Sequence, residues 1–422
     1  MVRGPPRRAP EVSPVVVPEA HSLALLDFLD APAGARLLDA ARATRDLAAH
    51  RRPGALAGLG TPEQIRAALT QDSLRLRAAA KTPHAERLLY TREALEQASP
   101  WPVARDRALR FGLAPGALLA DLTAGIGFDA LAAAEAGLRV IALERDPLRA
   151  RLLAFNARAL GLDGQVEVRE ADALAAPPPA DAAFLDPDRR AHGRRTRDAA
   201  DFEPPLAAWP ALLAGYTRAI VKTAPAARDD ATAVLASEVV SLGGEARERR
   251  LLWRGFQDAA PRRALALPGG ASVSGAGRPW PAPRLPAAGL WLFDPDVSVT
   301  LADLVGEVAH EHGLAPVHEA IAYLLGEEAA PSAPGTWLRI EAVLAPEAGP
   351  LDAWLTRHDV GQVEIRCRGV ADDASAWRKR IRPRGRGAAT LVFTRGCDDR
   401  WVALAARRAP LPLDPVLDAP AR

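Results

Sequence analysis

The alternation of short apolar runs with helical stretches between residues 116 and 268 constrains the fold more than any other feature of the chain. Strands that alternate with helices imply right-handed crossovers and a parallel sheet covered on both faces. We therefore expect an α/β, Rossmann-like, doubly wound sheet over 116–268. The expected strands are residues 117–123, 138–144, 166–172, 182–186 and 218–223.

The region before this core reads as helical. Residues 1–20 are rich in Pro and Arg and carry no apolar segment, so they predict a disordered tail and not a signal peptide. Over 21–115, apolar residues recur with a period near 3.6. Thr61 followed by Pro62 is a typical helix start. We expect an N-terminal helical region that packs on the core.

The region after the core divides into two parts. Residues 269–334 begin with a run rich in Gly, Pro and Ser, and we expect a loop and connecting segment there. Residues 335–410 show the order β-α-β-α-β-β, enough for a small α+β domain.

The composition of the chain bears on where in the cell the protein is expected. No apolar run reaches the roughly 18 residues that span a bilayer, so no membrane association is expected. The two cysteines, Cys367 and Cys397, form no C-x-x-C motif and have no nearby His, which excludes a disulfide framework and a zinc site. We expect a cytoplasmic protein without a metal, in an unknown oligomeric state.

A glycine-containing turn follows the first expected strand. The stretch DLTAGIGFD, residues 121–129, ends that strand and opens a helix. Gly125 and Gly127 allow a sharp turn and a close approach of a ligand. Glu144 closes the next strand 17 residues after Gly127, where a carboxylate takes ribose hydroxyls in doubly wound folds. Asp172 closes the third strand and could accept from an adenine amino group.

Two ligand classes compete for this turn. A dinucleotide would require a third glycine where Ala130 stands, and its pyrophosphate would be repelled by Asp121. Asp121 could instead hold the ammonium of an amino acid, which favours S-adenosylmethionine (SAM). In the alternative interpretation, Asp121 and Asp129 only cap the helix. The expected cofactor-binding residues are Asp121, Thr123, Gly125, Gly127, Asp129, Glu144, Asp172 and Asp186.

These motifs resemble those of class I SAM-dependent methyltransferases. The stretches TREALEQAS, FLDPDRR, DFEPPL, IVKTAP and VEIRCRG through RPRGRGAATLVFTR extend the resemblance, over residues 60–408, to bacterial methyltransferases with a C-terminal THUMP-like domain. The resemblance implies that Asp121, Gly125, Gly127, Glu144 and Asp172 line a SAM site.

The stretch after the fourth strand is expected to hold the catalytic groups. Methyltransferases acting on base amines place an acidic or amide residue there, followed by two prolines and an aromatic residue. Asp186 and Pro187 keep the first half, whereas Arg189 stands where the aromatic residue would be, and a guanidinium can also stack on a base. Asp186 is the expected acceptor or general base. Lys222, at the end of the next strand, faces the same crevice or pairs with a carboxylate. The candidate catalytic residues are Asp186, Arg189 and Lys222.

Two basic clusters suggest a nucleic-acid partner. Arg189, Arg190, Arg194, Arg195 and Arg197 follow the fourth strand, where they either bind phosphates or pair with neighbouring carboxylates such as Asp188 and Asp201. Residues 361–408 carry twelve basic and five acidic residues, consistent with RNA binding or with an Arg-rich surface. The expected RNA contacts are Arg189, Arg190, Arg194, Arg195, Arg378, Arg380, Arg382 and Arg384.

The sequence therefore predicts a SAM-dependent methyltransferase acting on RNA at a base nitrogen. One alternative is a protein or small-molecule acceptor, which the missing aromatic residue favours. Another is a SAM- and RNA-binding protein without turnover. Arg92, Glu96 and Gln97 either close over the SAM pocket or pack between helices.

Overall fold

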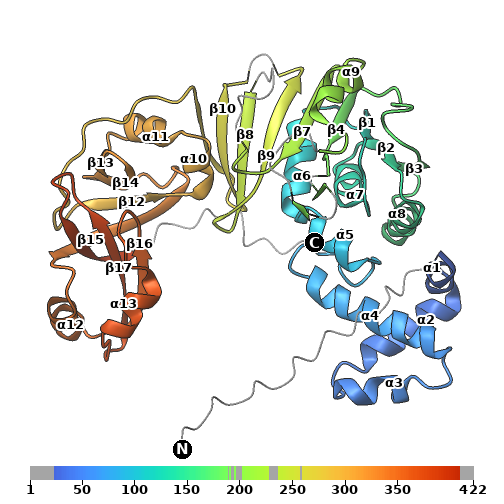
Figure 1. Cartoon of the computed structure of the whole chain (residues 1–422), viewed down its shortest axis with the longest axis horizontal. Coiled ribbons are helices and arrows are strands. Elements are labelled where there is room, and N and C mark those ends of the chain that lie inside the picture. The colour runs from blue at the N-terminus through green and yellow to red at the C-terminus, as the bar shows by residue number, and fades with distance from the viewer. Residues whose placement is uncertain are drawn as a thin grey trace, which may run out of the picture.

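The computed structural model describes residues 23–188, 190–191, 194–195, 202–227, 236–256 and 259–408, and it contains two large sheets (Figure 1). The predicted tail over 1–20 lies outside these residues. The first sheet has nine strands in the order β11-β10-β8-β9-β7-β4-β1-β2-β3. Its strands are β1 (Leu118–Asp121), β2 (Arg139–Glu144), β3 (Val166–Glu170), β4 (Ala182–Leu185), β7 (Arg218–Thr223), β8 (Ala236–Leu242), β9 (Glu245–Arg254), β10 (Arg262–Leu267) and β11 (Ala271–Gly275).

The five strands expected from the sequence form a contiguous parallel block in this sheet. β3, β2, β1, β4 and β7 are all parallel, while β9 runs antiparallel between β7 and β8. Both faces are buried because successive residues enter two different cores: Leu119 packs with α7 and α8, and Ala120 packs with α9. The prediction of a doubly wound sheet is confirmed. Its helices are α7 (Phe128–Glu135), α8 (Pro147–Leu160) and α9 (Trp209–Leu213).

The N-terminal region is helical, as its periodicity predicts. Thr61 accepts a hydrogen bond from the Gln64 amide, and the Gln64 side chain accepts one from the Thr61 amide, which closes a capping box at the start of α4. α6 packs against α7 of the core. The helices are α1 (Leu23–Asp30), α2 (Pro32–Ala43), α3 (Arg52–Ala55), α4 (Pro62–Ala78), α5 (Arg92–Gln97) and α6 (Trp101–Arg110).

The second sheet has seven strands in the order β13-β14-β12-β15-β18-β17-β16. From β15 onward its elements follow the predicted order β-α-β-α-β-β. These elements are β15 (Gly335–Leu344), α12 (Ala348–Arg357), β16 (Val360–Cys367), α13 (Ala374–Arg380), β17 (Gly387–Arg395) and β18 (Trp401–Arg408).

The segment 269–334 contains more regular structure than the loop we expected from its composition. Its longer runs without a helix or strand are residues 276–290 and 327–334. The short apolar strands β12 and β14 belong to the second sheet. Residues rich in Gly and Pro flank these strands, so the sequence pattern did not reveal them. The additional elements are β12 (Trp291–Pro295), β13 (Ala315–His318), β14 (Ile321–Gly326), α10 (Val297–Leu301) and α11 (Val305–Glu311).

A shared core joins the two sheets. Val239 of β8 and Ala264 of β10 pack in one cluster with Phe293 of β12 and Val299 of α10. Ser241 of β8 donates a hydrogen bond of 2.6 Å to Asp296, which caps α10. Figure 1 shows α10 between the two sheets. No helix among the described residues is both long and apolar enough to cross a membrane.

Candidate active site

A cavity of about 650 Å³ lies at the carboxyl ends of the parallel strands, within the size range of small-molecule sites. The loop after α5 forms another wall of the cavity. Most of the predicted cofactor-binding residues line it, together with the candidate catalytic residues Asp186 and Lys222. The predicted lining residues are Thr123, Gly125, Gly127, Asp129, Glu144, Asp172, Asp186 and Lys222.

The turn between β1 and α7 requires glycine at two positions. Gly125 has φ +57° and Gly127 has φ +93°, values that L side chains rarely adopt. A Cβ on Gly127 would lie 1.9 Å from Leu153 Cδ1, so α8 could not pack so closely against any other residue. At Gly125 a Cβ would meet no atom within 4 Å, consistent with open space for a ligand.

Two carboxylates at the strand ends present acceptors to the cavity. One Glu144 oxygen accepts the Gly125 amide at 2.8 Å, and the other accepts the Asp146 amide at 2.9 Å. These bonds fix the carboxylate and leave further lone pairs for ligand hydroxyls. Asp172 accepts the Leu174 amide at 2.8 Å and is otherwise exposed at the cavity wall. Both residues fit the ribose and adenine contacts that a nucleoside cofactor requires.

Asp121 lies behind the cavity lining and not in it. Its side chain is 1% exposed; one oxygen accepts the Thr123 amide at 3.3 Å, and Oδ2 has no partner among the described residues. Burial, followed by the neighbouring Asp129 carboxylate, raises the pKa of Asp121 well above its ordinary value. A cation bound nearby, such as an ammonium, would lower that pKa. Asp121 could therefore attract the ammonium of the expected ligand through its charge, although its side chain does not line the cavity.

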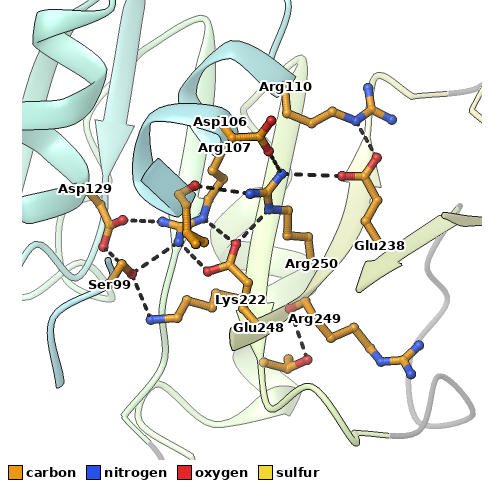
Figure 2. Close-up of polar contacts among 12 residues, drawn as sticks. Ser99, Asp106, Arg107, Arg110, Asp129, Lys222, Glu238, Glu248, Arg249 and Arg250 are labelled. Carbon is orange, nitrogen blue, oxygen red and sulfur yellow. Dashed lines mark hydrogen bonds and ion pairs between the residues drawn. The ribbon is translucent and has the colours of Figure 1, made fainter. Parts of the chain in front are cut away.

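A buried charge network forms one side of the site, and Figure 2 shows its members. Arg107 of α6 forms ion pairs with Asp129 and with Glu248 of β9. Ser99 accepts a hydrogen bond from Arg107 at 3.2 Å and donates one to Asp129 at 3.2 Å. Arg250 also pairs with Glu248, at 2.7 Å. Burial opposes ionisation of Glu248, but the two guanidinium groups outweigh it and lower its pKa to about 2.

The sequence pattern gave no sign of Ser99, Arg107 or Glu248 as site residues. The same helix carries Arg105, which is exposed, and Arg110, which is partly exposed, so the 2% exposure of Arg107 could not be inferred locally. Glu248 lies 141 positions away from it. The guanidinium of Arg107 also stacks over the Phe184 ring of β4, 4.3 Å from its centroid.

Lys222 and Asp186 form an ion pair in the cavity wall. Lys222 Nζ lies 2.5 Å from Asp186 Oδ2, and the two side chains are 11% and 27% exposed. Lys222 also donates to Ser99 Oγ at 3.2 Å (Figure 2). Burial alone would lower the pKa of Lys222, but the Asp186 and Asp129 carboxylates outweigh burial and raise it. The prediction that Lys222 faces the crevice and the prediction that it pairs with a carboxylate therefore describe the same geometry.

The N-terminal region supplies part of the cavity. Lys81 donates hydrogen bonds of 2.7, 2.9 and 2.9 Å to the carbonyls of Leu95, Glu96 and Ala98, which holds the loop after α5 against the cavity. Burial and the nearby Lys222 charge lower the pKa of Lys81 to about 8. Of the three residues considered as a closing element, Glu96 and Gln97 line the cavity, whereas Arg92 is exposed and does not.

The arginine-rich stretch after β4 is described only in part. Arg189 and Arg197 lie outside the described residues, as does Asp201. The backbone of β5 (Arg190–Ala191) pairs antiparallel with β6 (Arg194–Arg195). Their side chains are outside the description too, so the predicted contacts of Arg190, Arg194 and Arg195 stay predictions.

Backbone and ionic contacts secure both ends of this stretch. Asp188 and Glu203 exchange backbone hydrogen bonds of 2.8 and 2.9 Å. Glu203 also forms an ion pair with Arg145, which follows β2 at the cavity wall. Asp188 and Glu203, the described residues that flank the stretch, therefore both lie at the cavity wall.

Comparisons with known proteins identify the family. Two proteins of Mycobacterium tuberculosis, from strains CDC 1551 / Oshkosh and ATCC 25618 / H37Rv, are each 35% identical over 314 residues, covering 73% of this chain and 84% of theirs. Both are described as uncharacterized SAM-dependent methyltransferases. A family model described as THUMP domain-like matches residues 335–408.

A solved structure shows the same fold over nearly the whole chain. It is the crystal structure of a protein of Porphyromonas gingivalis W83, provisionally assigned as a methyltransferase. The TM-score is 0.74 at 22% identity, with 89% of this chain and 98% of that chain covered. With the strand-end carboxylates and the glycine turn in place, SAM is the cofactor, and the chain belongs to the class I SAM-dependent methyltransferases that carry a C-terminal THUMP-like domain.

Proposed function

We propose that this methyltransferase acts on RNA. The observation that carries the proposal is an exposed group of cations in the THUMP-like domain, which we call the α13 arginine cluster: Arg378, Arg380, Arg382 and Arg384. A local excess of cations on a chain with net charge +2 is the electrostatic footprint of a nucleic-acid surface.

One arginine of the cluster is held by contacts within the domain, and two others are available to bind a ligand. Arg380 pairs with Asp372 at 2.7 Å and lies over the Trp377 ring, 4.9 Å from its centroid. Arg378 and Arg384 form no hydrogen bond or ion pair with the part of the chain that the structure describes. Exposed cations of this kind bind phosphate with little dependence on sequence.

The cavity residues divide the work of binding SAM. Glu144 accepts from the ribose hydroxyls, Asp172 accepts from the adenine amino group, and the Gly125 region leaves room for the chain between them. SAM supplies a methyl group on a sulfonium, which is already a good leaving group. The protein therefore mainly supplies alignment and electrostatic stabilisation.

Two acceptor atoms are compatible with the residues at Asp186. Oδ1 of Asp186 has no partner among the described residues, so it could accept from an exocyclic amine, which keeps the predicted base nitrogen as a candidate. The ammonium of Lys222 beside the same carboxylate favours a second candidate, a hydroxyl.

The test is transfer of labelled methyl from SAM into a fractionated extract of cells that lack this protein. Wild type and Asp186→Ala would be compared, with Asp163→Ala as a control because Asp163 is an exposed carboxylate outside the cavity. We expect label in an RNase-sensitive fraction, lost in Asp186→Ala and retained in Asp163→Ala. Label only in protein or small molecules would refute the RNA proposal. SAM binding without label in any fraction would favour a binding protein without turnover.

A further inference from the structure

The ion pair between Lys222 and Asp186 has bonding capacity that the protein does not use. Lys222 donates one N–H to Asp186 and one to Ser99, and no other partner of its ammonium occurs among the described residues. Oδ1 of Asp186 is likewise without a partner there. Both residues line the cavity. The pair thus offers one donor and one acceptor to a group bound beside it.

A hydroxyl group has the complementary requirement. Its oxygen can accept from an ammonium N–H while its proton is donated to a carboxylate. As a hydroxyl attacks a methyl group it must lose its proton, and negative charge develops on its oxygen. A fixed ammonium at hydrogen-bond distance stabilises that charge.

An amine acceptor has the opposite requirement. Its nitrogen attacks through a lone pair and becomes more positive as the new bond forms. A neighbouring ammonium then opposes the reaction, because like charges repel strongly where water is excluded. The arrangement therefore suits oxygen better than nitrogen.

The network around Lys222 keeps its charge in one place. Ser99 is itself held by Arg107 and Asp129, and Arg107 is held by Glu248 (Figure 2). Such a buried, mutually bonded set cannot reorganise without leaving charges unpaired. The donor direction of Lys222 is thus fixed before the substrate arrives.

The rest of the cavity suits a sugar-phosphate backbone. Arg247 of β9 lines the cavity, where its guanidinium pairs with the exposed Glu245 at 2.7 Å and is still 36% exposed. Among the described residues that line the cavity, the aromatic side chain is Phe128, which is 2% exposed and packs against Trp101. The described wall therefore carries, in the same cavity as the ion pair, an arginine that could bind phosphate, but it presents no exposed aromatic ring to stack on a base.

We infer that the methyl acceptor is a ribose 2′-hydroxyl of RNA, bound between the ammonium of Lys222 and the carboxylate of Asp186. This inference rests on the proposed RNA function. The hydroxyl proton passes to Asp186 as its oxygen forms a bond to the methyl carbon. The bond between that carbon and the sulfonium breaks, and the electron pair stays on sulfur in S-adenosylhomocysteine. The 2′-hydroxyl is both donor and acceptor and occurs at every ribonucleotide.

The experiment reads the methylated position chemically. RNA from cells lacking the protein is methylated with labelled SAM and the wild-type enzyme, then hydrolysed in alkali. Alkaline cleavage requires a free 2′-hydroxyl, so 2′-O-methylation leaves the label in a resistant dinucleotide, whereas base methylation leaves it in mononucleotides. Label in dinucleotides supports the inference. Label in mononucleotides overturns it while the RNA function stands, and the absence of label from RNA overturns the RNA function itself.

A pair of substitutions tests the role of the ammonium. Lys222→Met keeps an unbranched side chain, one atom shorter, and removes the charge. Because Lys222 stabilises charge on the acceptor oxygen, we expect kcat to fall by about 10²–10³-fold, with SAM affinity changed less than about threefold. Lys222→Arg restores the charge and should recover part of the loss. A Lys222→Met enzyme with near wild-type kcat overturns the inference. If that variant does not fold, the alkali analysis of the wild-type product still decides.

Discussion

Substituting Glu248 by glutamine tests whether the buried network stabilises the fold. Glu248 is 1% exposed and accepts from Arg107 at 2.5 and 3.1 Å and from Arg250 at 2.7 Å. These contacts lower its pKa from 4.5 to about 2. At about 1.4 kcal/mol per pKa unit, the shift corresponds to about 3 kcal/mol of stability at neutral pH. Glu248→Gln should lose about that amount, within the range for breaking a buried ion pair.

The same pKa shift determines how the stability contributed by Glu248 depends on pH. Because the folded pKa lies below the unfolded one, this stability is fully present above pH 4.5 and is lost as the pH falls toward 2. The difference in unfolding free energy between wild type and Glu248→Gln should therefore shrink by about 2 kcal/mol between pH 7 and pH 3.

Urea denaturation followed by circular dichroism measures both effects. Glu245→Gln is the matched control, since Glu245 lies on the same strand and pairs with Arg247 at 2.7 Å but is 71% exposed. An exposed pair contributes at most about 1 kcal/mol. Equal losses in Glu248→Gln and Glu245→Gln, or a Glu248→Gln loss that stays constant with pH, would refute the reasoning.

Two further predictions address the glycine turn and the RNA surface. Gly127→Ala should destabilise the fold by about 1–3 kcal/mol more than Gly161→Ala. Both glycines have positive φ, but of the two only Gly127 has no room for a Cβ. Equal shifts of the urea midpoint would contradict this prediction. The double variant Arg378→Gln/Arg384→Gln should weaken RNA binding and reduce the slope of log K against log salt concentration by about 2. Arg66→Gln, which replaces an exposed arginine on α4, should change neither quantity. Filter binding at several salt concentrations would show an unchanged slope if the cluster does not contact phosphate.

Local patterns were enough to predict much of the fold. The five parallel strands and the elements after residue 335 followed from apolar periodicity and turn residues, which are properties of neighbouring positions. The connecting segment 269–334 was the exception. Its short strands β12 and β14 pair with distant strands and are flanked by Gly and Pro, so composition alone suggested a loop.

For the candidate site, the sequence determined the strand ends and the glycine turn: it identified Gly125, Gly127, Glu144 and Asp172, because backbone conformation and position at a strand end are local properties. Tertiary structure alone decided which charges meet. It placed Asp121 behind the cavity lining.

The tertiary structure also brought Arg107 of α6 to Glu248 of β9 and set Lys222 against Asp186 and Ser99. Pairing between buried charges depends on packing of elements far apart in the chain, and burial turns an ordinary Arg, Lys or Glu into a fixed electrostatic element of the site.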